Sequence, residues 1–217
     1  RLSHFYFREL EDGNPLDSSV YLAYQQSDDF LGELMDTAER MHGSLLVFSE
    51  IGFGRLQAFV EVNDYLFQSG LLRRSDGKSV DYENSTAFES VQGTHGVNIH
   101  TKNRYRHGLI GEDEYENVLQ HTMNLLRKMP NPHNDQPMFS RVTQGRGYAE
   151  TKNLPDILME PYDWEYLPYG DPYWAGHVTR HHQTGWHRTN RYWGNYPHES
   201  GLRKIEEIHD LIVKEIQ

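Results

Sequence analysis

A short apolar run that ends in a polar pair is the stretch of this sequence best suited to carry chemistry. Within Ser44–Gly54, five small or apolar residues are followed by Ser49 and Glu50 and then by a Gly-x-Gly turn. Such a run is typical of a strand buried on both faces. Ligands of open α/β sheets bind just beyond the carboxyl ends of strands, so Ser49, Glu50 and Ile51 stand where a site is expected. The alternative is a core strand followed by a solvated turn.

Histidines supply the other side chains suited to binding a metal. His4 lies among aromatic residues near the start of the chain, and His187 belongs to a cluster of five histidines in residues 177–198. The chain contains no cysteine, so a metal site would use imidazole, carboxylate or hydroxyl ligands. Two other interpretations stay open: His4 as a packed, hydrogen-bonded ring, and the cluster as a polar or pH-sensitive loop. His95 and His100 are weaker candidates of the same kind.

The spacing of apolar residues predicts the elements that would hold these side chains. Helical spacing and terminal signals predict helices over residues 17–40, 111–129 and 202–216. They also predict a short helix that follows Arg55–Ala58 and ends near Gln68. Short apolar runs predict strands over residues 45–49, 86–90 and 96–100. Residues 1–8 are expected to be a strand end or a loop that enters a helix, and residues 162–174 an irregular loop.

Several of these segments together resemble the type I phosphodiesterase / nucleotide pyrophosphatase branch of the alkaline phosphatase superfamily. That family follows an apolar strand with Ser-Asp-His-Gly-Phe, at the place of Ser49–Phe53 here, and continues into a helix similar to Val62–Leu72. Phe139–Thr143 is similar to a strand of the family, and Leu154–Pro161 is similar to its Pro-Asp strand, whose start has a structural role. Thr184–His187 matches its Thr-Gly-x-His pattern, and His4 fits the His of its Asp-x-x-x-His pattern.

The resemblance implies a fold. It implies an alkaline-phosphatase-like α/β fold in which a mostly parallel central sheet is flanked by helices, with residues 45–49 as an interior strand. Residues 1–217 would form the C-terminal portion of a single domain of this kind. Residues 73–180 would be its more irregular part and would suit a small lobe.

The resemblance also implies metal ligands, because family members bind two catalytic metals. His4 and His187 would bind one divalent metal, Zn or alternatively Mn, near the carboxyl end of residues 45–49. Glu50 takes the place of an Asp that binds the other metal, and it keeps a carboxylate. Ile51 takes the place of a His and cannot bind a metal. We therefore expect this second position to be weak or empty.

The implied activity is metal-dependent hydrolysis of phosphate esters. The family carries its Thr or Ser nucleophile in an N-terminal half, so we expect the nucleophile upstream of Arg1 and assign no catalytic residue within the chain. One alternative is a degenerate, non-catalytic relative that acts as a binding or assembly subunit, which the change at Ile51 favours. The expected partners are a small-molecule phosphate ester and either the N-terminal half or another subunit.

Charge and hydropathy argue against several other partners. The formal net charge is −11, whereas binding to nucleic-acid duplexes or anionic membranes needs basic patches. No apolar stretch reaches the length of a membrane span and no signal peptide is visible, so we expect a cytoplasmic protein. The mean hydropathy of −0.80 is low, and 14 Tyr and 4 Trp are expected to supply part of the buried surface.

Overall fold

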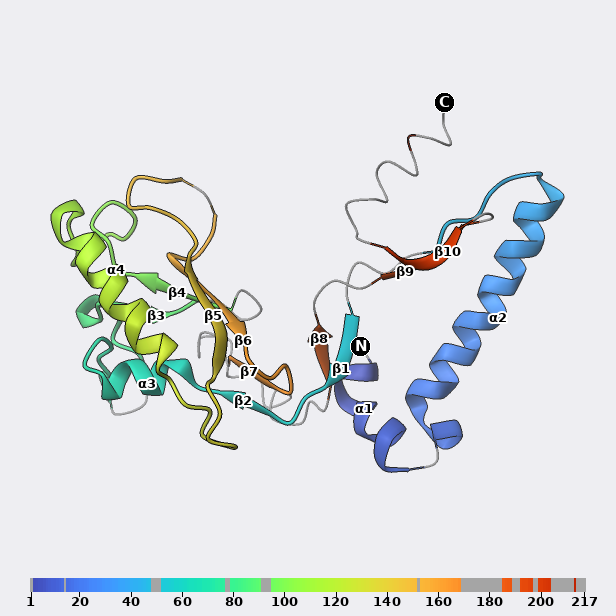
Figure 1. Cartoon of the computed structure of the whole chain (residues 1–217), viewed down its shortest axis with the longest axis horizontal. Coiled ribbons are helices and arrows are strands. Elements are labelled where there is room, and N and C mark those ends of the chain that lie inside the picture. The colour runs from blue at the N-terminus through green and yellow to red at the C-terminus, as the bar shows by residue number, and fades with distance from the viewer. Residues whose placement is uncertain are drawn as a thin grey trace. The chain divides into compact units, whose positions relative to one another are not determined.

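The computed structural model describes residues 2–13, 15–47, 52–76, 79–90, 95–151, 153–168, 185–188, 192–196, 199–203 and 213, with the backbone alone at 186–188, 192–196 and 199–203. The chain forms two compact units, each with its own helices and strands (Figure 1). Unit 1 contains residues 1–56 and 182–217, and unit 2 contains residues 57–181.

Unit 1 combines two α-helices with two small antiparallel sheets, β1–β8 and β9–β10. Its helices are α1 (Leu2–Asp12), the short 3-10 helix η1 (Pro15–Asp17) and α2 (Ser19–Arg40). Its strands are β1 (Gly52–Arg55), β8 (Gly185–Arg188), β9 (Tyr192–Tyr196) and β10 (Glu199–Arg203). Helix α1 packs against α2 and against both strands of the β1–β8 sheet.

The helix predicted over residues 17–40 is confirmed as α2. Ser18 is its N-cap, because the Ser18 hydroxyl accepts a hydrogen bond from the Tyr21 amide at 3.0 Å. The prediction for residues 1–8 is wrong, since residues 2–8 belong to helix α1 rather than to a strand end or loop. His4 and Phe7 lie three residues apart on one face of α1, and both contact Phe53 of β1. These distant contacts stabilise the helix, and the local sequence pattern does not show them.

The interior strand predicted at residues 45–49 is not formed in its described part. Residues 44–46 lie in no strand, and Val47 makes a single bridge. The side chains of Leu45–Val47 are half-buried rather than enclosed on both faces. Among the described residues, regular pairing begins at Gly52, where β1 meets β8. An apolar run becomes an interior strand only if neighbouring strands on both sides pair with its backbone, and the described part of this run makes only the single bridge at Val47. Residues 48–51 lie outside the described residues.

Unit 2 is built on a four-stranded antiparallel sheet in the order β3-β4-β6-β5, with a separate parallel pair, β2 and β7. Helix α4 packs against β5 and β4 of the larger sheet (Figure 1). The helices are α3 (Val62–Gln68), the 3-10 helix η2 (Tyr82–Asn84) and α4 (Glu112–Arg127). The strands are β2 (Ala58–Val60), β3 (Ala87–Glu89), β4 (Gly96–Ile99), β5 (Phe139–Gln144), β6 (Ile157–Pro161) and β7 (Tyr166–Pro168).

The predicted α/β class is confirmed, and most of the elements predicted in unit 2 are present. The helix expected over residues 111–129 is α4, with three acidic residues in its first turn. The four strands expected after residue 85 are β3, β4, β5 and β6. Parallel pairing, expected for most of the central sheet, joins β2 to β7, whereas the four-stranded sheet is antiparallel. Short connections, such as that between β3 and β4, suit antiparallel strands only.

The remaining segment predictions have mixed outcomes. Residues 73–180, expected to be more irregular, lie in unit 2 and include α4 and the whole four-stranded sheet. The expected loop at 162–174 contains β7. Of the helix expected at 202–216, Val213 is helical, the first two residues belong to β10, and the others lie outside the described residues. In the described part of the chain, no helix has both the length and the apolar character that crossing a bilayer requires.

A buried carboxylate joins the parts of unit 2. Asp156 directly precedes β6, and its side chain is fully buried. Its Oδ1 accepts hydrogen bonds from Arg104 and, at 2.7 Å, from the Tyr115 hydroxyl of α4. Its Oδ2 accepts a hydrogen bond from the Ile99 amide of β4 at 2.9 Å and lies 3.6 Å from the Arg146 guanidinium. Burial and the hydrogen bond to Asp156 raise the pKa of Tyr115, so the hydroxyl keeps the proton that it donates.

Replacing Asp156 with asparagine should lower the free energy of unfolding of unit 2 by about 3 kcal/mol, because two largely buried guanidinium groups lose their anion. Urea unfolding followed by hydrogen exchange of the α4 amides would measure this loss. Asp64→Asn is the matched control. The Asp64 side chain is 49% exposed and pairs with Arg74, and exposed pairs contribute only about 0–1 kcal/mol. Equal losses in the two variants would contradict the central role of Asp156.

Candidate metal centre

Helix α1 brings the ring of His4 to strand β8. The His4 Nδ1 atom lies 3.1 Å from the carbonyl oxygen of Gly185. A carbonyl oxygen only accepts hydrogen bonds, so Nδ1 donates, and Nε2 of the neutral ring then carries the lone pair. The ring also meets the ring of Phe53 edge-on, with centroids 5.0 Å apart and an interplanar angle of 79°. His4 therefore has the tautomer and the fixed ring that a histidine ligand needs.

The glycine at position 185 allows this close approach. A Cβ atom placed there would lie 2.5 Å from the Ser3 carbonyl oxygen and 2.7 Å from the Phe7 Cβ, and it would also overlap the ring of Phe53. Both backbone and side-chain atoms of α1 therefore occupy the space that a side chain would need. The glycine of the Thr-Gly-x-His pattern has a packing reason, because it lets α1 lie directly on β8.

The pairing of β1 with β8 aligns the two segments that carry the other predicted ligands. In this antiparallel register, Phe53 is opposite His187 and Gly52 is opposite Arg188. His187 lies two residues beyond Gly185 on β8, about 6.6 Å along the strand. The structure thus brings His4 against the strand that carries His187. Glu50, which precedes β1, lies outside the described residues, as do Ile51 and the side chain of His187.

Within the described residues, no three histidine, aspartate or glutamate side chains lie close enough together to bind a metal. The predicted ligand set therefore depends on His187 and Glu50, whose side chains are outside that part of the chain. The donor chemistry nevertheless fits a borderline metal, because a fixed neutral imidazole is a common ligand of both Zn and Mn. Ligation by His4, His187 and Glu50 stays a prediction.

The other two candidate histidines have structural positions in unit 2. His100 is buried, its Nδ1 lies 3.1 Å from the Ser85 carbonyl oxygen, and its ring centroid lies 5.0 Å from that of Tyr105. His95 has a positive φ of 43°, and its carbonyl accepts a hydrogen bond from the Met159 amide at 2.8 Å. Burial lowers the pKa of both rings. These surroundings are those of packed rings rather than of metal ligands.

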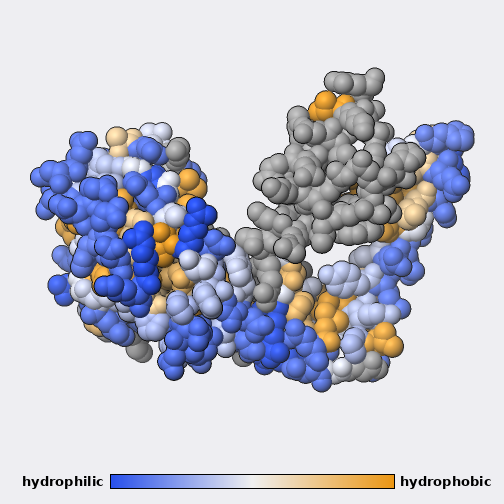
Figure 2. Space-filling model, in the orientation of Figure 1, coloured by the Kyte–Doolittle hydropathy of each residue, from blue (hydrophilic) through white to orange (hydrophobic). Residues whose placement is uncertain are grey.

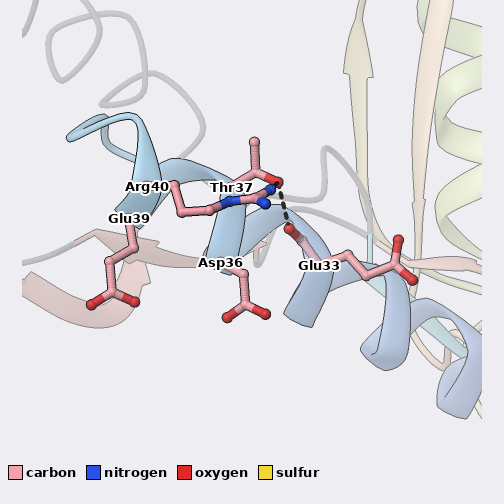
Figure 3. A pocket seen from close by; sticks show the side chains of 5 residues that line it. All are labelled: Glu33, Asp36, Thr37, Glu39 and Arg40. Carbon is pink, nitrogen blue, oxygen red and sulfur yellow. Dashed lines mark hydrogen bonds between the residues drawn. The ribbon is translucent and has the colours of Figure 1, made fainter.

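Two grooves lined by described residues lie along α2, and His4 lines neither of them. One has a volume of about 440 Å³ and is lined by three carboxylates, Thr37 and Arg40, all from the last turns of the helix (Figure 3). There Arg40 donates a hydrogen bond of 2.9 Å to the Thr37 hydroxyl, and that hydroxyl donates one of 2.9 Å to the Glu33 carbonyl. Side chains of a single exposed helix do not converge on one point, so we assign this groove no chemistry.

The second groove is apolar. It has a volume of about 630 Å³ and lies between α2 and residues 45–47, with Asp28 as its one charged lining residue among those described. Several large apolar side chains of α2 are exposed around it, among them Tyr24 at 62% and Phe30 at 60%. Figure 2 shows apolar patches interrupting the hydrophilic surface of this helix. The groove contains no histidine, so it suits contact with apolar surface rather than metal binding.

Two residues near His4 were not singled out from the sequence. Phe53 belongs to the Ser49–Phe53 motif and Gly185 to the Thr184–His187 motif. In both motifs, only the positions of the predicted metal ligands were given a functional role. Gly185 itself could have indicated this packing, because a glycine in a strand often marks a place where another backbone approaches closely. No sequence pattern indicated that the ring of Phe53 contacts the ring of His4.

Comparison with known proteins confirms the resemblance read from the sequence. The model of the family described as Type I phosphodiesterase / nucleotide pyrophosphatase matches residues 2–190 of the 217. The matched span contains His4, Glu50, Phe53, Gly185 and His187. The α/β structure agrees with the alkaline-phosphatase-like fold expected of this family. Neither the curated proteins nor the solved structures provide a match.

Acidification from about pH 7.5 to pH 5.5 should lower the free energy of unfolding of unit 2. Burial lowers the pKa of His100 below 6.5 in the folded protein, and unfolding restores the ordinary value. Below that value the unfolded chain binds a proton that the folded chain excludes, so acid favours unfolding. His100→Phe should reduce this pH dependence in urea titrations, and His121→Asn, a change at an exposed residue of α4, should not. An unchanged dependence in His100→Phe would show that this ring is not responsible.

Proposed function

This chain belongs to the Type I phosphodiesterase / nucleotide pyrophosphatase family, and we propose that it hydrolyses small phosphate esters with a bound divalent metal. The observation that supports this proposal is the hydrogen bond of 3.1 Å between His4 Nδ1 and the Gly185 carbonyl oxygen. It joins the histidine of one family motif to the glycine of another, two residues before His187. Both motifs lie inside the matched span.

In this proposal His4 and His187 hold one metal, Zn or alternatively Mn, through their imidazole nitrogens. Such a metal, when bound, neutralises charge on the phosphoryl group and activates the nucleophile. The carbonyl of Gly185 keeps the proton of His4 on Nδ1, so that Nε2 is the nitrogen with the lone pair. The nucleophile is proposed to be a Thr or Ser upstream of Arg1, and no residue of the chain is given that role.

The second metal position is proposed to be weak. Glu50 offers a carboxylate that is one methylene longer than the Asp used by the family, and Ile51 offers no ligand where the family has a His. Loss of a direct ligand should weaken binding by more than the 10–100-fold that is typical for loss of an outer partner. The chain would then have one well-formed metal position and reduced two-metal catalysis.

A second candidate function is that of a non-catalytic binding or assembly subunit. The apolar groove of α2 favours it, since large exposed apolar patches often mark interaction sites. The proposed partner is the N-terminal half of the family's domain, which would cover Tyr24 and Phe30. Protection of the α2 amides from hydrogen exchange on addition of that half would support this candidate, and unchanged exchange would argue against it.

Replacing either predicted ligand with alanine should lower zinc affinity by more than about 100-fold, because each change removes a direct ligand. Competition with a chromophoric chelator would measure the affinities of His4→Ala and His187→Ala. His121→Ala is the matched control, because His121 is an exposed histidine of α4 in the other unit. If all three variants bind zinc as the unmodified chain does, the proposed site is wrong.

The zinc complex should also bring the two rings together. Bonds from nitrogen to zinc measure about 2.0–2.1 Å, so the bound nitrogens of His4 and His187 should lie within about 4 Å of each other. A crystal structure of the zinc complex would test this distance. A separation of more than roughly 10 Å would end the claim that they share one metal.

Restoring the family residues at the second position, with Glu50→Asp and Ile51→His together, should add about one bound metal per protein. The full-length protein is the right test material, and its metal content and turnover of an aryl phosphodiester should rise together. Glu50→Asp alone is the control, because it leaves Ile51 without a ligand atom. If the unmodified protein binds two metals tightly and turns over such esters at about 1–10³ per second, the second position is not impaired.

A further inference from the structure

The ring of Phe53 lies where β1, β8 and α1 meet. It contacts His4 edge-on, with ring centroids 5.0 Å apart, and it contacts Phe7 at 5.6 Å with an interplanar angle of 44°. On the β8 side it occupies the space that a side chain at position 185 would fill. The backbone of Phe53 pairs with His187 in the β1–β8 register. One residue therefore contacts one predicted ligand and is the strand partner of the other.

A hydrogen bond to a carbonyl oxygen does not by itself fix an imidazole ring. The bond between His4 Nδ1 and the Gly185 carbonyl sets which nitrogen donates, but the ring can still pivot about the bond axis. An edge-on contact with a second ring restricts this pivot, because aromatic pairs have a preferred geometry. Phe7 of the same helix contacts the Phe53 ring as well, at a centroid distance of 5.6 Å, whereas the edge-on contact with His4 is made by Phe53 itself.

We propose that Phe53 is a positioning residue, which holds the His4 ring against the Gly185 carbonyl with the proton on Nδ1 and the lone pair on Nε2. The inference rests on the proposed function only in one respect, namely that zinc is the metal which the positioned His4 ring would bind. The position and tautomer of the ring are properties of the metal-free chain. Phe53 acts through His4 and touches neither metal nor substrate.

The test compares two substitutions that remove one ring each from the same cluster. Phe53→Leu removes the ring in contact with His4 and keeps an apolar side chain. Phe7→Leu is the matched control, because it removes a ring of similar size from the same cluster and leaves the edge-on contact between Phe53 and His4 in place. Both are made in the complete chain and checked for folding by dispersion of the amide NMR spectrum. Gly185→Ala, which forces α1 away from β8, is a third variant that should disturb the His4 ring by another route.

The first readout is the tautomer of His4 in the metal-free chain, read from imidazole ¹⁵N and ¹³C chemical shifts. We expect the Nδ1–H form in the unmodified chain, loss of that preference in Phe53→Leu, and its retention in Phe7→Leu. An unmodified chain with the proton on Nε2 would overturn the inference without any variant. Retention of the Nδ1–H form in folded Phe53→Leu would overturn it as well.

The second readout is zinc affinity, measured with the metal alone. Phe53→Leu should bind zinc about 10-fold more weakly than the unmodified chain, as expected for loss of a group that orients a ligand. Phe7→Leu should change affinity by less than this. Equal affinities of Phe53→Leu and the unmodified chain would contradict a positioning role. If the unmodified chain binds no zinc, the proposed metal function fails, and the tautomer measurement alone decides whether Phe53 positions His4.

Discussion

The absence of a side chain at Gly185 is the constraint on which the arrangement of α1, β1 and β8 depends. A single Cβ atom there would meet backbone and side-chain atoms of α1 and the ring of Phe53. The helix would have to move away from the strand, and the hydrogen bond from His4 to the Gly185 carbonyl would be lost. The glycine of the Thr-Gly-x-His pattern therefore meets a packing requirement, two residues before the predicted ligand His187. The proposed metal site needs this glycine, because it lets α1 bring His4 to the strand that carries His187.

Unit 2 depends on a polar interaction instead of a close approach. Asp156 is fully buried, and the Arg104 and Arg146 side chains that face it are 15% and 11% exposed. Two guanidiniums face one carboxylate, so their remaining contact with water helps to accommodate the excess charge. The apolar core around this network holds α4 on the sheet, with Leu119, Leu126 and other residues fully buried. None of the predicted ligands belongs to this network, so the stability of unit 2 can be altered without touching them.

The sequence predicted those elements whose burial follows from their own spacing. Helices α2 and α4 have apolar stripes and terminal signals, and both appear where they were expected. Residues 1–8 were misread because their helix is stabilised by contacts up to 181 residues away. The apolar run at 45–47 was misread because strand formation requires a neighbouring strand. At the site, the resemblance of two motifs to those of the family pointed to His4 and His187. The role of Phe53 depends on ring geometry, which no spacing rule contains.

The parallel pair in unit 2 explains how β1 and β8 can meet although a whole unit separates them in sequence. Strand β2 follows β1 almost directly, and it pairs with β7, the last strand described before β8. The Gln57 amide also donates a hydrogen bond of 2.8 Å to the Glu165 carbonyl. Once unit 2 is folded, the loop to be closed between β1 and β8 is reduced to residues 56–57 on one side and 169–184 on the other. Closure entropy grows with loop length, so a folded unit 2 lowers the cost of pairing Phe53 with His187.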